Sequence, residues 1–284
     1  MKKILITGSN GQLGLELQKR LSDKYELILT NRLSLDITDF QQAMNYVKIS
    51  APDIIINCAA YTAVDLCEQH EDEAYKSNAL GPKNLVLAAN EINAKLVHIS
   101  TDYVFDGNGI KDENGNVRPY YETDTTNPQS AYGRTKLEGE KFVIHNSNKY
   151  FIIRTAWLYG EGKNFVRTMI NLSKTNEEVK VVNDQIGSPT STAELSNMIE
   201  KLIETEKYGI YHGTCEGYCS WYDLTCEIYK IMNIKTRVSP VTTDEFPRPA
   251  KRPKYSVLEN RNLKKLEIYE FKKWQDALKV YLDK

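Results

Sequence analysis

The first half of the chain alternates short, unbroken apolar runs with longer stretches of helical periodicity. The apolar runs predict five strands, at residues 3–7, 26–30, 53–59, 95–100 and 150–156. The stretches between them predict four helices, at residues 12–22, 39–50, 71–90 and 131–146. Strands without polar alternation are typical of a parallel sheet that is covered on both faces. We therefore expect a doubly wound α/β sheet, in which ligands bind beyond the carboxyl ends of the strands.

The pattern becomes mixed after Trp157 and predicts a smaller, partly discontinuous second lobe. Its expected helices are residues 164–174, 192–204, 220–232 and 274–282, and its expected strands lie near 179–182, 209–212 and 236–241. Two further segments read as loops, at residues 107–128 and 244–256. We expect a main domain of residues 1–157 plus about 186–213, and a second lobe of about 158–185 plus 214–284.

Composition excludes several classes of partner. The 37 basic and 38 acidic residues give a net charge of −1, which provides no long-range attraction to nucleic acid or to an anionic membrane. No apolar stretch is long enough to span a bilayer, and nothing after Met1 resembles a signal peptide. The five cysteines are an odd number, which argues against a disulfide framework. We therefore expect a cytoplasmic protein.

A zinc site is the alternative use of three of these cysteines. Cys215, Cys219 and Cys226 lie near His212, but their spacing matches no common zinc motif. Cys226 also falls within an apolar helical pattern. We expect buried thiols here and no bound metal.

The sequence "GSNGQLG" places three glycines directly after the first strand and at the start of a helix. Gly8 allows a tight turn, Gly11 lets the backbone approach a pyrophosphate, and Gly14 permits close packing of helix on sheet. The helix N-terminus offers unpaired N–H groups to the anion. This context favours a Rossmann-type dinucleotide site over a glycine turn that serves packing alone.

The spacing G-x-x-G-x-x-G resembles that of the short-chain dehydrogenase/reductase superfamily, in its extended, sugar-nucleotide branch. After the second strand the chain has Asn31 and Arg32, where an acid would bind the ribose hydroxyls of NAD. Arg32 can pair with the 2′-phosphate of NADPH, so we prefer NADPH and leave NADH open. The alternative is that Arg32 is a solvated surface residue. The resemblance implies that Asp36 and Ile37 contact the adenine.

The stretch "YGRTK" places Tyr132 and Lys136 four residues apart on one face of a predicted helix. A nearby ammonium favours the phenolate and is expected to lower the pKa of Tyr132. Thr101, directly after the strand "KLVHIS", can hold a carbonyl oxygen beside the phenol, and Ser100 can order the strand end near the cofactor. This set suits reduction of a carbonyl by hydride from a nicotinamide. The alternative is that Tyr132 packs and Lys136 is solvated.

Taken together, the motifs resemble the dTDP-4-dehydrorhamnose reductase family over nearly the whole chain. The stretches that carry the resemblance are "GSNGQLG", "NCAAYTAVDLCE", "STDYVFDG", "NPQSAYGRTKLEGE", "RTAWLYG", "NFVRTMI", "DQIGSPT" and "RPKYS". The resemblance implies reduction of the C4 ketone of dTDP-4-dehydro-L-rhamnose. The main domain would then bind the dinucleotide, and the second lobe the sugar nucleotide.

The resemblance also implies roles for individual residues. Cofactor contacts are implied for residues already discussed, which are Gly8, Gly14, Asn31, Arg32, Asp36, Ile37, Ser100, Tyr132 and Lys136. They are also implied for Asn10, Gly11, Gln12, Leu13, Ala59, Ala60, Tyr61 and Thr62. Those implied to contact the sugar nucleotide are Thr101, Asp102, Val104, Tyr132, Trp157 and Arg252. Trp157 would form an apolar wall for the 6-methyl group, and Arg252 would meet the diphosphate. Of the neighbouring Arg248, Lys251 and Lys254, we expect two to be solvated.

Three alternative functions remain open. The first is reduction of another nucleotide-linked 4-keto-6-deoxy sugar. The second is a dehydratase or epimerase, but related dehydratases carry Asp-Glu after the catalytic threonine, and this chain has Asp102-Tyr103. The third is a non-catalytic, NADP-binding regulatory subunit, which would need no proton donor. The oligomeric state, monomer or homodimer, is also open.

Overall fold

The computed structural model describes residues 1–283, and its centre is a six-stranded sheet. All neighbouring strands pair in parallel, in the spatial order β12-β7-β4-β3-β1-β2. The strands are β1 (Lys3–Thr7), β2 (Glu26–Leu29), β3 (Ile54–Asn57), β4 (Lys95–Thr101), β7 (Tyr150–Thr155) and β12 (Gly209–His212). Because β2 and β3 lie on opposite sides of β1, the carboxyl end of β1 is a crevice suited to a ligand.

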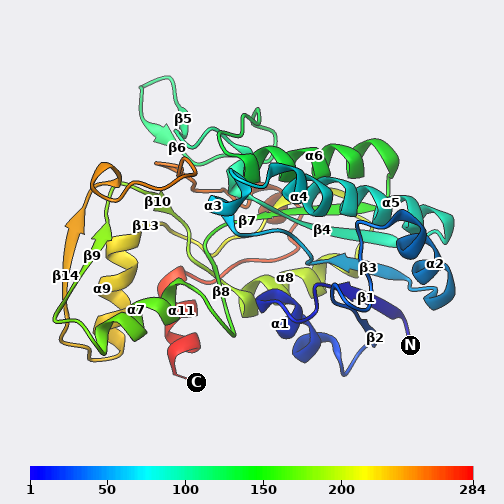
Figure 1. Cartoon of the computed structure of the whole chain (residues 1–284), viewed down its shortest axis with the longest axis horizontal. Helices are drawn as coiled ribbons and strands as arrows, with labels where there is room; N and C mark the ends of the chain where they lie inside the picture. The colour runs from blue at the N-terminus through cyan, green and yellow to red at the C-terminus, as the bar shows by residue number, and fades with distance from the viewer. Residues whose placement is uncertain (284) are drawn as a thin grey trace.

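Helices cover both faces of this sheet (Figure 1), which confirms the predicted doubly wound class. One face packs on α1 (Gln12–Leu21) and α8 (Thr192–Ile203). The other face packs on α2 (Phe40–Ser50), α5 (Gly81–Glu91) and α6 (Ala131–Asn146). Side chains alternate along each strand, so Ile4 and Ile6 enter the first core while Leu5 enters the second.

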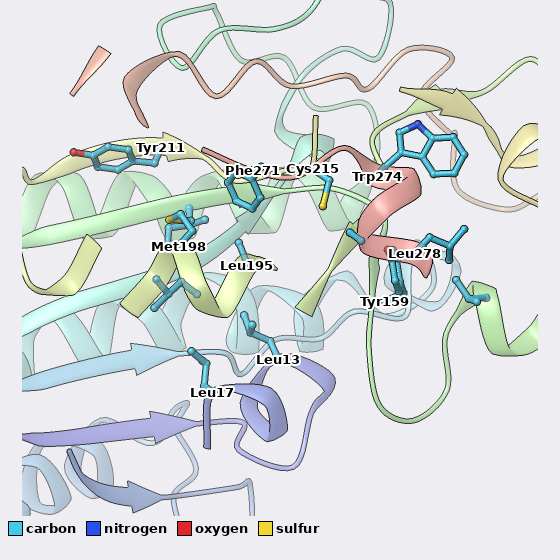
Figure 2. Close-up of a cluster of buried hydrophobic side chains, with 14 of the residues drawn as sticks. Leu13, Leu17, Tyr159, Leu195, Met198, Tyr211, Cys215, Phe271, Trp274 and Leu278 are labelled. Atoms are coloured by element: carbon cyan, nitrogen blue, oxygen red, sulfur yellow. The ribbon is translucent and has the colours of Figure 1, made fainter. Parts of the chain in front are cut away.

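The larger core joins the sheet to the end of the chain. In Figure 2, Leu195 and Met198 of α8 lie between Leu17 of α1 and the side chains of Tyr211 and Phe271. The final helix, α11 (Trp274–Leu282), adds apolar side chains to the same cluster. The C-terminal segment therefore packs in a hydrophobic core that also contains residues of the second lobe, such as Val179 and Leu224.

The second lobe is built around two parallel strands, β9 (Glu178–Val182) and β14 (Arg237–Val241). Packed beside them are α7 (Phe165–Ser173) and α9 (Trp221–Ile231). The elements that the sequence pattern missed are all short: α3 (Val64–Cys67), α10 (Arg261–Lys265), β5 (Ile110–Lys111), β6 (Val117–Arg118), β8 (Leu158–Tyr159), β10 (Ile186–Gly187), β11 (Thr190–Ser191) and β13 (Cys219–Ser220). Two residues are too few to show a period, so tertiary pairing alone defines these strands.

The segment 71–90 is helical, as predicted, but it is not one regular α-helix. It consists of α4 (Glu71–Tyr75), a π-helical turn (Lys76–Leu80) and α5. The turn brings the carbonyl of Asn78 against α6, where a Cβ on Gly139 would lie 2.2 Å from that oxygen. Glycine at 139 is therefore required by this close approach, and π-turns of this kind often mark functional sites.

A buried ion pair fixes α6 against the sheet. The carboxylate of Glu140 accepts from Nε of Arg154 at 3.0 Å and from Nη2 at 2.7 Å, and Oγ of Ser100 donates to it at 2.5 Å. Glu140 is 0% exposed and Arg154 is 3% exposed, so neither charge has access to water. The pair holds the middle of α6 against the ends of β4 and β7.

No helix within residues 1–283 is both long and apolar enough to cross a membrane.

Replacing Glu140 by glutamine should leave the Arg154 guanidinium buried and unpaired. We expect Glu140→Gln to lower the free energy of unfolding by about 3–5 kcal/mol, measured by urea denaturation. The control is Lys141→Met, which removes an exposed pair with Glu138 on the same helix and should change the free energy by less than about 1 kcal/mol. Equal effects of the two variants would contradict a structural role for the buried pair.

Candidate active site

One cavity of about 1110 Å³ runs from the carboxyl ends of β1 and β2 into the second lobe. It brings together nearly every predicted site residue. Those that border it are Gly8, Asn10, Gly11, Gln12, Leu13, Gly14, Asn31, Arg32, Asp36, Ile37, Ala59, Ala60, Tyr61, Thr62, Ser100, Thr101, Asp102, Tyr132, Lys136, Trp157 and Arg252.

Val104 is the exception among the predicted residues. Its side chain is 0% exposed and packs with Phe105, Tyr120 and Leu258 in a small hydrophobic cluster outside the cavity. The short 3₁₀ turn at Asp102–Val104 rotates this side chain inward while Asp102 stays at the cavity. The predicted contact of Val104 with a substrate is contradicted by this placement.

The glycine turn after β1 leaves no room for side chains. Gly8 has a φ of +64°, and a Cβ there would lie 2.7 Å from the backbone nitrogen of Ala59. A Cβ on Gly14 would lie 2.6 Å from the carbonyl oxygen of Gly8. Helix α1 begins after Gly11 without a side-chain cap, so its first N–H groups are free to meet an anion. Oε1 of Gln12 is buried beside this turn and has no hydrogen-bond partner within residues 1–283.

The loop after β2 presents an unpaired cation. Oδ1 of Asn31 accepts from the backbone N–H groups of Leu33 and Ser34, at 2.9 and 3.2 Å, and so closes a turn. The exposed Arg32 makes no ion pair or hydrogen bond through its side chain within residues 1–283. The carboxylate of Asp36 is held by N–H and Oγ1 of Thr38, at 2.9 and 2.7 Å. Arg32 is therefore the group best placed to meet a phosphate at the end of the cavity next to β2.

The stretch "STDY" at the end of β4 supplies the polar centre of the cavity. Oγ1 of Thr101 donates to Oδ1 of Asp102 at 2.8 Å and accepts from the N–H of Tyr103 at 3.2 Å. Oδ2 of Asp102 is buried without a partner among the described residues. Burial raises the pKa of Asp102 from 3.8 to about 6. Ser100 points instead to Glu140, so its side chain stabilises the strand end.

Tyr132 and Lys136 border this centre from the first turns of α6. Burial raises the pKa of Tyr132 above its ordinary value, and the nearby Asp102 carboxylate raises it further. Nζ of Lys136 donates to the carbonyl of Ile99 at 2.5 Å, and burial lowers the pKa of Lys136 to about 8. In this arrangement the pKa of Tyr132 is therefore raised and not lowered as predicted, because the phenol is buried and the charge that acts on it is the Asp102 carboxylate.

A stacked pair of tryptophans walls the cavity beyond this centre. Trp157 stacks on Trp221 with ring centroids 3.4 Å apart and an angle of 6° between the planes. The φ of Trp157 is +47°, which is unusual for a bulky residue. Gly187 also approaches the ring closely, since a Cβ there would lie 2.4 Å from the indole. Trp157 is thus packed against both Trp221 and Gly187, and only part of the ring is left to serve as the predicted wall.

Trp221 itself was not singled out from the sequence. It begins α9, about sixty residues after Trp157, and only its place before an apolar helical pattern could have marked it. Asn78 was also missed, because no local sequence pattern marks it as a site residue. Its amide accepts from the N–H of Tyr61 at 2.8 Å and donates to the carbonyl of Tyr61 at 3.1 Å, so it holds the cavity wall at that residue.

The basic loop of the second lobe crosses to the main domain. Nη2 of Arg252 pairs with Asp65 of α3 at 2.8 Å, and Nη1 lies 3.3 Å from the hydroxyl of Tyr103. Arg248 also borders the cavity, whereas the exposed Lys251 and Lys254 do not. Arg252 therefore links the two lobes where the cavity opens.

The structure places the cysteines in packing positions. Cys215 and Cys219 are buried in the larger hydrophobic core, as Figure 2 shows for Cys215. Burial raises the pKa of the Cys215 thiol to about 12, which disfavours the thiolate that a metal would need. Within residues 1–283, no group of three or more His, Cys, Asp or Glu side chains is arranged to hold a metal ion.

The raised pKa of Asp102 predicts how stability depends on pH. The folded protein binds this proton more tightly than the unfolded chain, so stability should fall as the pH rises from about 4 to about 6. Asp102→Asn should remove this loss and raise the free energy of unfolding at pH 7.5 by about 1–3 kcal/mol, with a smaller gain at pH 4. Urea denaturation at both pH values measures this. The exposed Asp72→Asn serves as control, and an Asp102→Asn gain that is the same at both pH values would contradict the burial argument.

A family model and several solved structures match this chain over nearly its whole length. The family model described as "RmlD substrate binding domain" matches residues 1–284. A solved structure of a dTDP-4-dehydrorhamnose reductase from Clostridium acetobutylicum is 54% identical, with a TM-score of 0.95, over 99% of this chain and 98% of that chain. The corresponding enzyme of Bacillus anthracis, solved in complex with NADP, is 44% identical, with a TM-score of 0.95, over 100% and 99%.

A curated relative adds a third comparison. The spore coat polysaccharide biosynthesis protein SpsK of Bacillus subtilis is 40% identical over 284 residues, which cover 99% of this chain and 97% of that protein. All three matches span both lobes. The chain therefore belongs to the RmlD substrate binding domain family.

Proposed function

We propose that this chain is an NADPH-dependent reductase that converts dTDP-4-dehydro-L-rhamnose to dTDP-L-rhamnose. The observation that carries the proposal is the convergence of Thr101, Tyr132 and Lys136 beside a glycine cradle in one cavity. The names of the two solved relatives support the substrate, and NADP in one of them supports the cofactor. The buried thiols are compatible with a reducing cytoplasm.

The residues of the main domain fit a dinucleotide. The cradle at Gly8 and Gly14 would be filled by any Cβ, which suits the close approach of a pyrophosphate to the backbone. The orphaned Oε1 of Gln12 lies at the same turn. Arg32 would hold the 2′-phosphate, and Lys136 would donate to the nicotinamide ribose. When bound, the nicotinamide supplies the hydride for reduction.

The residues of the polar centre would handle the proton. Tyr132 gives its phenolic proton to the oxygen that develops negative charge at C4. An amine whose pKa is about 8 is mostly protonated at neutral pH, so Lys136 can stabilise the resulting phenolate. Thr101 has one hydroxyl hydrogen, which Asp102 now accepts, and it must turn from Asp102 to donate to the ketone. Trp157 and Arg252 would contact the sugar and the diphosphate.

The assay of this function is NADPH oxidation with dTDP-4-dehydro-L-rhamnose supplied as substrate. Tyr132→Phe should lower turnover by a factor of about 10²–10⁴ because the proton donor is lost, while NADPH affinity stays unchanged. The control is Tyr46→Phe, a half-buried tyrosine of α2 outside the cavity, which should keep normal turnover. Near-normal turnover of Tyr132→Phe would refute its role as the donor.

The cofactor preference depends on Arg32. Arg32→Ala should weaken NADPH binding about 10- to 100-fold and NADH binding much less, because only NADPH carries the 2′-phosphate. Fluorescence titration with each reduced cofactor measures both affinities. The control is Lys201→Ala, at an exposed residue of α8, which should change neither affinity. If Arg32→Ala weakens both cofactors equally, Arg32 does not meet the phosphate.

A further inference from the structure

The short helix α3 carries two carboxylates to which neither cofactor binding nor proton transfer gives a role. It belongs to the stretch "NCAAYTAVDLCE", in which the residues assigned to the cofactor end at Thr62. Asp65 lies within α3, and Glu68 directly follows it. Each side chain bonds to a segment distant in sequence, Asp65 to the loop 244–256 and Glu68 to the start of α6. α3 therefore touches both segments that carry proposed substrate-handling residues (Figure 1).

Asp65 anchors the loop 244–256 at two points. Oδ1 of Asp65 accepts from the N–H of Ala250 at 3.2 Å, and Oδ2 accepts from Nη2 of Arg252 at 2.8 Å. Ala250 is 1% exposed, so its N–H needs a partner within the protein. The loop contains three prolines, which donate no backbone hydrogen bonds, so it cannot form a ladder of its own. One carboxylate of the main domain thus fixes both the backbone and the arginine of this loop.

The bond to Asp65 leaves Arg252 able to bind an anion. A guanidinium has more N–H donors than these contacts use, because Asp65 takes one and the hydroxyl of Tyr103 lies 3.3 Å from another nitrogen. The remaining donors of Arg252 have no partner within residues 1–283. Both Asp65 and Arg252 border the cavity. A diphosphate can therefore bind Arg252 while Asp65 still holds it, which makes Asp65 a support and not a competitor.

Glu68 holds the start of α6, beside the proposed proton donor. Its Oε1 accepts from the N–H of Ala131 at 2.8 Å. Ala131 is the first residue of α6 and is 0% exposed, so its N–H has neither an intrahelical partner nor access to water. Tyr132 is the next residue, and Cys67 of α3 packs with Ala131 and Tyr132 in one hydrophobic cluster. The position of the Tyr132 backbone therefore depends on α3.

A tyrosine connects the two anchored groups a second time. The hydroxyl of Tyr103 lies 3.3 Å from Nη1 of Arg252. Its ring meets the ring of Tyr132 edge to face, with centroids 5.5 Å apart and an angle of 77° between the planes. The guanidinium and the phenol are thus held relative to each other by packed groups on two sides, through α3 and through Tyr103.

We propose that α3 sets the distance between the arginine that binds the diphosphate and the tyrosine that donates the proton. Asp65 is the positioning residue for Arg252, and Glu68 is the positioning residue for Tyr132. The inference rests on the proposed function, in which the diphosphate and the C4 ketone belong to one substrate. Proton transfer requires that both ends of this substrate be placed accurately at once. Each carboxylate acts through the residue that it holds, so Asp65 governs substrate binding and Glu68 governs turnover.

The first test measures steady-state kinetics of Asp65→Ala with NADPH and dTDP-4-dehydro-L-rhamnose. KM for the sugar nucleotide should rise at least about tenfold, while kcat stays within about threefold and NADPH affinity is unchanged. Asp65→Asn keeps an acceptor and should recover most of the loss. In the Arg252→Ala background, Asp65→Ala should raise KM by less than about threefold, because the residue it positions is gone. A lower KM for Asp65→Ala would mean that Asp65 competes with the diphosphate, and would overturn the proposal.

The second test applies the same assay to Glu68→Ala. Here kcat should fall at least about tenfold while KM stays within about threefold, because Tyr132 is displaced and Arg252 is not. Glu68→Gln keeps the acceptor for Ala131 and should recover most of kcat. The matched control is Glu71→Ala, which removes an exposed pair with Arg134 of the same helix, outside the cavity, and should change neither constant.

A general loosening of the fold would give a different result. Asp65→Ala and Glu68→Ala would then change KM, kcat and NADPH affinity together, and this outcome would overturn the proposal. Circular dichroism checks the fold of each variant. If Asp65→Ala does not fold, Asp65→Glu decides, since it keeps the charge but moves the carboxylate by one methylene. KM of Asp65→Glu should rise at least about threefold with kcat unchanged, and an unchanged KM would overturn the proposal.

Hydrogen exchange on the full chain without ligands separates this inference from the proposed function. Asp65→Ala should speed exchange across residues 244–256 at least about tenfold, and Glu68→Ala should do so at the start of α6. Exchange that is unchanged in both segments would overturn the role of α3 whether or not the protein turns over the substrate. Turnover by the unchanged protein with a normal KM in Asp65→Ala would also overturn it and leave the reductase intact. Faster exchange in both variants without turnover by the unchanged protein would support the anchoring by α3 and refute the proposed reaction.

Discussion

The geometry of the candidate site depends on the buried pair of Glu140 and Arg154. Glu140 lies one helical turn after Lys136 on α6, and Arg154 lies three residues before Trp157 on β7. Ser100, the neighbour of Thr101, donates to the same carboxylate. One charged interaction thus connects the three elements that carry the proposed proton donor, the hydroxyl beside it and the aromatic wall. A charge pair without access to water is stable only when both partners are placed accurately, so it specifies this register strictly.

The cavity concentrates groups that a stable fold would avoid. Asp102 is buried with an unpaired oxygen, Lys136 is buried with a lowered pKa, and Trp157 has a left-handed backbone. Each of these features destabilises the folded state. They persist because the surrounding sheet and helices are tightly packed, with Ile4, Ile6 and their neighbours fully buried. Such local conflicts between stability and placement are expected where binding or chemistry occurs.

The sequence predicted the elements that repeat and missed those that tertiary contacts create. The long strands and helices followed from apolar periodicity, and the glycine cradle followed from residue types that only a tight turn requires. Two-residue strands such as β8 and β11 show no period and exist only through pairing. Val104 was misplaced because a 3₁₀ turn, which its sequence does not reveal, directs it into a hydrophobic cluster. Distance along the chain also hid Trp221, which stacks on Trp157 although α7 and β9 lie between the two residues in sequence.

Charge placement explains how a nearly neutral chain could hold two polyanions. With a net charge of −1, the protein has no overall field that would attract a dinucleotide or a sugar nucleotide. Binding must therefore rely on local groups, and the cavity has them at both ends. The N-terminus of α1 and Arg32 lie at one end, and Arg248 and Lys180 lie at the other. The uncharged tryptophan pair and the buried polar centre lie between these ends. In the proposed function, this separation holds two diphosphates apart while their reactive rings meet beside Tyr132.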